Sequence, residues 1–346
     1  MLKKIVMGAA VLFGAILVVI AIIVLTYKPK QRPASAEAFE RTPARVERGR
    51  YLVEFAIGCV DCHSKRDMTI YGGPIVGPHG AGSDCIGPEQ GAPGKVCFAN
   101  LTPDNETGLG AWSDGEILRA IREGVSRDGS ALFPMMPYSE FSALSEEDGK
   151  AIVVYLRTLP PVKNAIARSE VKFPISFFIK FAPRPLDGPV PEPDQKDPVQ
   201  NGKYLAKVTG CKFCHTPVDD HHQTVAGREF SGGQEFPGGL RSANITPHAT
   251  GIGARDQQAF IGMFRAWAGT PVEALPKIDP KQNTLMPWLL RAHMSDEDLG
   301  ALYAFLRTVP PIENNVPKRA APTAPAPPPA AAAATGAAGA GVPAPK

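Results

Sequence analysis

The feature that most constrains the fold of this chain is a short cysteine and histidine motif that occurs twice. Residues 59–63 read CVDCH and residues 211–215 read CKFCH, so both copies have the pattern C-x-x-C-H. Each copy belongs to a longer repeat, in which RGRYLVEFAIGCVDCH matches NGKYLAKVTGCKFCH and ANLTPDNETGLG matches ANITPHATGIG. Because the matching elements keep their order and spacing, the sequence predicts two homologous modules.

The predicted fold class is all-α, with two tandem domains at 40–165 and 196–316. Each has an ordinary size for one small domain. Residues 166–195 form the predicted linker. Its apolar part, residues 173–181, is too short to span a membrane. We expect this part to pack against one or both domains, with a contact to a membrane surface as the alternative.

Helices are predicted before each motif, over 113–124 and at the end of each domain, where apolar residues recur at helical spacing. Ser145 and Ser295 are the predicted N-caps of the two final helices. A Pro-Pro pair follows each final helix and ends it.

The two ends of the chain differ in composition from the domains. Residues 5–26 carry no charge, follow Lys3 and Lys4, and are numerous enough to span a bilayer as a helix. They predict a single-pass anchor in the inner (cytoplasmic) membrane, with a cleaved signal peptide as the alternative. Both alternatives place the domains on the periplasmic side. Residues 317–346 are rich in alanine and proline, which predicts a disordered tail.

The motif C-x-x-C-H is the attachment signature of c-type haem. Two thiols form thioethers with the haem vinyl groups, and the adjacent histidine lies under the iron. Zinc would need further ligands at zinc spacing, and a thioredoxin-like site would need a βαβ context. The chain therefore predicts two covalently bound haem c groups, one in each repeat. Their predicted attachment and proximal residues are Cys59, Cys62 and His63, and Cys211, Cys214 and His215.

Haem iron has a sixth coordination position, and its occupant separates electron transfer from catalysis. The repeat singles out Met136 and Met286, each followed by proline and an aromatic residue. Met135 has leucine as its counterpart and is the weaker candidate. The alternative is that both methionines only fill gaps in the core. We predict that Met136 and Met286 are the axial ligands.

The remaining two cysteines are Cys85 and Cys97, in a glycine- and proline-rich loop that the second repeat largely lacks. Because the chain is exported in either reading of its N-terminus, we expect a disulfide between them. A pair of free thiols is the alternative.

These modules resemble class I cytochromes c, and most closely the cytochrome c subunits of membrane-bound dehydrogenases for alcohols and gluconate. The shared features are C-x-x-C-H, the Asn-x-Thr-Pro and Thr-Gly-x-Gly segments, the Met-Pro-aromatic step and the final Pro-Pro. The resemblance implies that Trp112 contacts a haem propionate. The second repeat has Arg255 there, which would pair with a propionate or lie exposed. Those subunits typically carry three haems, whereas this chain has two motifs.

The predicted function is electron transfer by a membrane-anchored dihaem cytochrome, and the chain itself is not predicted to be an enzyme. Its expected partners are a donor dehydrogenase or quinol-oxidising complex, an acceptor oxidase or cytochrome, and the membrane. The net charge of +3 is too small to indicate nucleic-acid binding, and no stretch of the sequence forms a basic stripe. A dihaem peroxidase-like enzyme is the alternative, although methionine at the sixth position argues against it. A haem-based sensor has no visible output domain.

Overall fold

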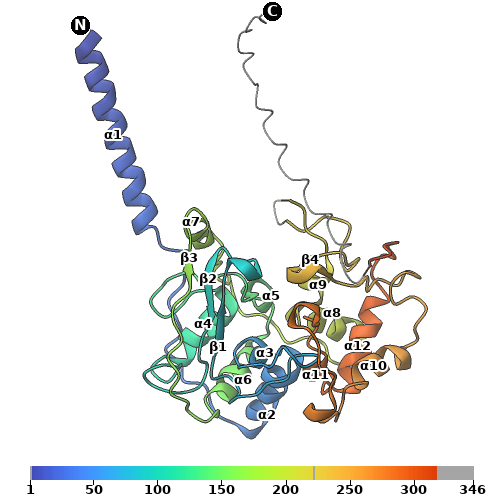
Figure 1. Cartoon of the computed structure of the whole chain (residues 1–346). Helices are drawn as coiled ribbons and strands as arrows, with labels where there is room; N and C mark the ends of the chain where they lie inside the picture. The colour runs from blue at the N-terminus through green and yellow to red at the C-terminus, as the bar shows by residue number, and fades with distance from the viewer. Residues whose placement is uncertain (1, 221–222, 318–346) are drawn as a thin grey trace, which may run out of the picture.

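The computed structural model describes residues 2–220 and 223–317, and helices are its main regular structure (Figure 1). The disorder predicted for 317–346 falls, apart from residue 317, outside the described residues. The α-helices are α1 (Leu2–Thr26), α2 (Pro43–Tyr51), α3 (Cys59–Cys62), α4 (Asp114–Glu123), α5 (Tyr138–Phe141), α6 (Glu146–Leu156), α7 (Ile175–Phe178), α8 (Pro198–Val208), α9 (Cys211–His215), α10 (Gln257–Arg265), α11 (Trp288–Arg291) and α12 (Asp296–Leu306).

Helix α1 projects away from the rest of the molecule in Figure 1. Within the described residues, its stretch Lys3–Thr26 is the one helix long and apolar enough to cross a membrane, with a mean hydropathy of 3.1. None of that stretch is buried against the protein. These properties fit a membrane anchor and also a signal sequence, the two alternatives that the sequence predicted.

The same helix pair forms in both repeats, because α2 packs on α6 and α8 packs on α12. A glycine sits at each crossing. A side chain at Gly49 would collide with the carbonyl oxygen of Ala151, and one at Gly202 would collide with that of Ala301. Glycine at these positions therefore lets two backbones approach each other closely. The packed helices bury apolar residues of both repeats in one continuous core.

The first repeat has one more residue than the second between the shared tyrosine and the glycine that precedes the motif. The structure accommodates this residue as a π-helix, η1 (Leu52–Ala56). The equivalent part of the second repeat is plain α-helix. A π-bulge absorbs an inserted residue without breaking the helix. The C-x-x-C-H motif therefore follows the end of the equivalent helix in both repeats.

The predicted all-α class covers most of the regular structure, but two small antiparallel sheets also occur in the described residues. A strand pair follows each motif, and none of these strands exceeds five residues. Strands this short, in glycine- and proline-rich loops, lack the alternation of apolar and polar residues from which a strand is predicted. The strands are β1 (Ser83–Ile86), β2 (Gly94–Phe98), β3 (Glu170–Val171), β4 (Glu235–Phe236) and β5 (Leu240–Arg241), with 3₁₀ turns η2 (Pro88–Gln90), η3 (Ile179–Phe181), η4 (Pro237–Gly239), η5 (Val272–Ala274) and η6 (Pro280–Gln282).

A tyrosine of the first repeat completes a helix start in the second. The hydroxyl of Tyr51 donates to Asp298 Oδ2 at 2.6 Å and accepts from the backbone N–H of Ser295 at 3.2 Å. Ser295 is the N-cap of α12, and its Oγ accepts from the Asp298 N–H as predicted. The tyrosine thus accepts from the backbone N–H of the N-cap residue itself, the role that a side chain at the third helical position has in a capping box.

The reciprocal contact joins the second repeat to the first. The hydroxyl of Tyr204 donates to Asp148 Oδ2 at 2.6 Å and accepts from the N–H of Ser145 at 3.4 Å. Ser145 is the N-cap of α6, again as predicted. Arg48 also pairs with Asp148, with an N–O distance of 2.7 Å. Since Tyr51 and Tyr204 occupy equivalent positions in the repeat, each repeat makes the same contact to the other.

The apolar part of the predicted linker does not pack as expected. Only Phe177, Ile179 and their neighbours are partly covered, whereas Phe173 is 71% exposed and Phe178 is 62% exposed. Strand β3 does pair with β2, which attaches this segment to the first repeat.

Candidate haem sites

Each C-x-x-C-H motif forms a short helix that begins at a glycine in the left-handed region. Gly58 has a φ of 76° before α3, and Gly210 has a φ of 75° before α9. Residues other than glycine adopt this conformation at a cost in free energy. The helical turn places the two cysteines of each motif, three residues apart, on one side of the chain.

The histidine of each motif is held by a backbone carbonyl. The Nδ1 atom of His63 lies 2.7 Å from the oxygen of Ala99, and that of His215 lies 2.7 Å from the oxygen of Ala243. Burial lowers the pKa of both histidines, and the carbonyl contact opposes this effect. A neutral imidazole that donates from Nδ1 leaves the Nε2 lone pair free, which is how a histidine presents itself to a metal.

The carbonyl that holds His63 belongs to a braced loop. Next to Ala99, the Oδ1 atom of Asn100 accepts from the N–H of Thr102 at 3.0 Å and from its hydroxyl at 2.7 Å. The Asn100 amide donates to the carbonyl of Val162 at 2.8 Å. This network explains why asparagine, threonine and the segment after Pro-Pro recur together.

The second repeat has the same brace. Asn244 Oδ1 accepts from the N–H and the hydroxyl of Thr246, at 2.9 and 2.8 Å, and its amide donates to Ile312 O at 2.8 Å. Two sites that differ in surrounding sequence therefore orient their histidines in one way.

Three of the four motif thiols, those of Cys59, Cys62 and Cys214, lie in surroundings that favour their neutral form. Burial raises the pKa of Cys59 and of Cys62 to about 12, and that of Cys214 to about 11. Zinc binds thiolates, whereas thioether formation uses the thiol. No group of three or more His, Cys, Asp or Glu side chains is arranged to hold a metal ion in residues 2–220 and 223–317. The donor set of each motif thus fits haem c.

The two predicted methionine ligands occupy equivalent places. Met136 and Met286 are partly buried against the core, just before α5 and α11. Each carbonyl accepts from the N–H two residues on, at 2.8 Å, in Tyr138 and in Trp288. Met135, the weaker candidate, is 38% exposed.

The two residues named for a propionate contact differ in burial. Trp112 is half-buried and packs against the core. Arg255 is exposed, and its Nη1 donates to the carbonyl of Gly251 at 3.3 Å. A contact with a propionate remains a prediction for both.

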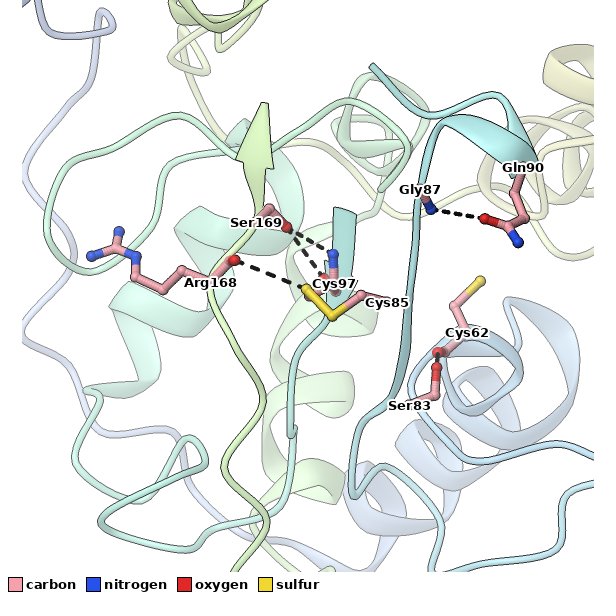
Figure 2. The surroundings of a disulfide bond; sticks show 8 residues. All are labelled: Cys62, Ser83, Cys85, Gly87, Gln90, Cys97, Arg168 and Ser169. Atoms are coloured by element: carbon pink, nitrogen blue, oxygen red, sulfur yellow. Dashed lines mark hydrogen bonds between the residues drawn. A yellow bond between two sulfur atoms is a disulfide. The ribbon is translucent and has the colours of Figure 1, made fainter. Parts of the chain in front are cut away.

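A disulfide joins Cys85 and Cys97, the pair that the sequence indicated. Figure 2 shows it linking β1 to β2 beside the first motif. From β1, the hydroxyl of Ser83 donates to the carbonyl of Cys62 at 2.9 Å. Strand β2 ends one residue before Ala99. The disulfide-linked hairpin therefore carries the carbonyl that orients His63.

Arg291 is a buried cation that the sequence reasoning missed. Its side chain is 7% exposed, and its Nη2 donates to the carbonyl of Thr209, two residues before the second motif, at 2.8 Å. Its Nη1 has no hydrogen-bond partner among the described residues. The adjacent Leu290 lies against Gly58, next to the first motif. A comparison of the two repeats could have identified this position, because the residue equivalent to Arg291 in the first repeat is Phe141.

Glu54 is a second missed residue. It lies on η1, is 6% exposed, and its two oxygens contact His79 Nδ1 at 2.5 Å and the Tyr155 hydroxyl at 2.8 Å. The three line a cavity of about 500 Å³ together with Phe55 and others. The hydrogen bond to Glu54 raises the pKa of His79. Only the extra residue in the first repeat hinted at a special structure there.

No family model matches the chain. It is 27% identical over 299 residues to the cytochrome c subunit of an alcohol dehydrogenase (quinone) from Gluconacetobacter polyoxogenes, covering 81% of this chain and 59% of that protein. It is 29% identical over 285 residues to the gluconate 2-dehydrogenase cytochrome c subunit of Pantoea cypripedii, covering 77% and 60%. The chain thus spans about three fifths of the length of these relatives.

A shorter relative matches over nearly its full length. The dihaem c-type cytochrome of Cereibacter sphaeroides is 27% identical over 285 residues, which covers 80% of this chain and 90% of that protein. The chain is therefore homologous to the cytochrome c subunits of membrane dehydrogenases and to a dihaem c-type cytochrome.

Proposed function

We propose that this protein is a membrane-anchored dihaem cytochrome c that transfers electrons and has two tandem haem domains, 40–165 and 196–316. The observation that carries the proposal is the duplicated donor set. Each repeat sets two thiols on one helical turn next to a histidine whose Nδ1 is held by a carbonyl. That arrangement fits covalent attachment and proximal ligation in both halves.

Each haem, when bound, supplies iron that cycles between Fe(III) and Fe(II) and so carries one electron. The residues of the chain attach, orient and shield it. His63 and His215 provide the proximal nitrogens, and Met136 and Met286 provide the axial sulfurs. A methionine opposite histidine raises the reduction potential and leaves no open position on the iron. This ligand set favours electron transfer over the peroxidase-like alternative.

We infer that the two haems exchange electrons directly, because side chains of one repeat reach the motif of the other. Leu290 of the second repeat lies against Gly58, immediately before the first motif. Arg291 of the second repeat also lies near Asp61 of the first motif, whose carboxylate opposes the lowering of the pKa of Arg291 by burial. Contacts of this kind support a relay in which an electron passes directly between the haems within one chain.

The names of the relatives suggest the partners. They are cytochrome c subunits of dehydrogenases, so we propose a dehydrogenase or a quinol-oxidising complex as donor and an oxidase or another cytochrome as acceptor. Helix α1 would hold the relay in the inner membrane with both domains on the periplasmic side.

The test is the spectrum of the full-length protein purified from membranes. Two covalent haems per chain are expected by mass, with a ferric absorption band near roughly 695 nm that reports methionine ligation. Met136→Ala and Met286→Ala should each remove about half of that band, and Met135→Ala should leave it unchanged. High-spin spectra with rapid peroxide turnover in the unmodified protein would instead favour the enzyme.

A further inference from the structure

Residues 173–181 form an exposed apolar patch on the first repeat. Phe173, Phe178 and Phe181 are 71%, 62% and 50% exposed, and Ile175 is 41% exposed. Single apolar side chains on a surface are ordinary, but a cluster of large ones marks an interaction site. The patch comprises α7 and η3, which lie beside the end of α1 in Figure 1.

The patch is continuous with helix α1. Tyr27 follows the last residue of α1 and stacks on Phe181, with a ring-centroid distance of 4.6 Å. It also meets the edge of Phe177 at 6.4 Å. Aromatic residues at the end of an apolar helix are typical of the level where lipid headgroups meet hydrocarbon.

A lysine of the patch satisfies the end of α1. The Nζ atom of Lys180 donates to the carbonyl of Val24 at 2.9 Å, one of the carbonyls that have no partner within the helix. A cation is also favourable at a helix C-terminus. Lys28 and Lys30 follow Tyr27 closely in the sequence, Lys172 directly precedes Phe173, and all three lysines are exposed. Aromatic rings flanked by lysines match an interfacial membrane contact.

The patch is fixed to the first repeat rather than loosely tethered. Strand β3 pairs with β2, the N–H of Lys172 donates to the carbonyl of Pro93 at 3.0 Å, and the N–H of Cys97 donates to the Ser169 hydroxyl at 2.9 Å. Strand β2 leads to Ala99, which orients His63. The position of the patch therefore determines the position of the first haem site.

We propose that residues 173–181 insert into the headgroup region of the bilayer as a second membrane contact, which orients the first haem domain on the membrane. This inference rests on the proposed membrane span of α1. The occupant of the patch is lipid, because the patch continues the surface of α1 and shares its aromatic and basic border.

Site-directed spin labelling of the full-length holoprotein tests this. The proposed haem attachment and the disulfide use all six cysteines, so one introduced cysteine reacts alone. Labels are placed by Phe178→Cys in the patch, Leu17→Cys in α1 and Val225→Cys on the second repeat, where Val225 is a 37% exposed apolar residue. The protein is reconstituted in vesicles of phosphatidylethanolamine and phosphatidylglycerol, and collisions with oxygen and with a nickel chelate are compared.

The expected oxygen-to-nickel ratio at position 178 lies several-fold above that at 225 and below that at 17. A ratio at 178 equal to that at 225 overturns the proposal, and so does protection from both reagents, which would mean that protein covers the patch. A low ratio at 17 would refute the membrane span itself. The absorption spectrum of the same sample tests the proposed electron-transfer role separately.

A second variant separates lipid contact from local folding. With the label at 178, the pair Phe173→Ser and Phe181→Ser should lower the oxygen-to-nickel ratio toward the value in water. The matched control Val76→Ser, at a 53% exposed residue outside the patch, should leave the ratio unchanged. An oxygen-to-nickel ratio that stays unchanged after both phenylalanines are replaced would contradict the proposal.

Discussion

Arg291 is a single side chain that distinguishes the two proposed haem sites. It replaces the buried Phe141 of the first repeat and donates to the backbone just before the second motif. Burial lowers the pKa of Arg291, and the carboxylate of Asp61 in the first motif opposes this effect. Its charge thus lies between the motifs and nearer the second.

We predict that Arg291→Gln lowers the reduction potential of the second haem more than that of the first. For an assumed separation of roughly 10 Å and an effective dielectric constant of about 20, one charge contributes about 1.7 kcal/mol. That is about a fifteenfold change in the reduction equilibrium, or ~70 mV for one electron. Spectroelectrochemical titration measures both midpoints.

The matched control is Arg255→Gln in the same repeat. Arg255 is exposed, so any effect of its charge should be smaller and should shrink with added salt. Arg291→Lys keeps the charge and should keep the potential. Equal midpoints in Arg291→Gln and the unmodified protein would rule out the electrostatic role.

His79 gives the first repeat a pH-dependent stability. The hydrogen bond to Glu54 raises the pKa of His79 in the folded protein. Its contribution to stability is therefore complete below the unfolded value of about 6.5 and is lost as the pH rises through the higher folded value. We predict that the difference in unfolding free energy between the unmodified protein and His79→Gln is largest below about pH 6 and shrinks at alkaline pH.

Urea unfolding at a series of pH values measures this difference. Tyr155→Phe serves as control, because it removes the other bond to Glu54 and leaves the titrating pair in place. A difference that stays constant with pH would show that His79 stabilises the fold only by packing.

At the scale of elements, the disulfide-linked hairpin supports only the first site. Strand β2 carries Cys97 and ends beside Ala99, whereas the hairpin of β4 and β5 has no such bond. We predict that Cys85→Ala with Cys97→Ala lowers the unfolding free energy by at most about 3 kcal/mol. It should also change the midpoint of the first haem while the second stays constant. Equal shifts in both midpoints would contradict this assignment.

Local signals predicted several elements correctly and missed others for identifiable reasons. Ser145 and Ser295 were readable as N-caps because a cap depends on one side chain and the following turn. The π-helix η1 was not predicted, because an inserted residue can form either a loop or a bulge, and the surrounding packing determines which of the two forms. The strands were not predicted, because strand pairing joins residues that are far apart in the sequence, such as Glu170 and Lys95.

At the scale of the whole molecule, two tyrosine hydroxyls join the repeats. We predict that Tyr51→Phe and Tyr204→Phe each lower the unfolding free energy by about 1.5 to 3 kcal/mol, because each removes a hydrogen bond to a carboxylate. Denaturant unfolding of the single and double variants measures this. Tyr303→Phe is the control, since its hydroxyl donates to the neutral carbonyl of Arg255 within one repeat. Unchanged midpoints in the double variant would contradict the prediction.

The repeat predicted the two candidate haem sites but not the contacts that join the two copies. The motifs, the methionines and the braced asparagines can be found from matched positions within one sequence. The contact between repeats depends on Tyr51, Tyr204 and Arg291, which look like ordinary helix residues until the helices are placed. A position where the repeats differ, such as Phe141 and Arg291, was the available clue to that surface.

The reciprocal tyrosines also bear on the history of the chain. Each copy of the repeat gives the other the same contact that it receives, which is the arrangement found at the two-fold axis of a symmetric homodimer. Fusion of two genes for a self-associating single-haem protein would leave this pattern. On that view the interface is older than the segment that now joins the copies, and the joining segment was free to evolve a different task.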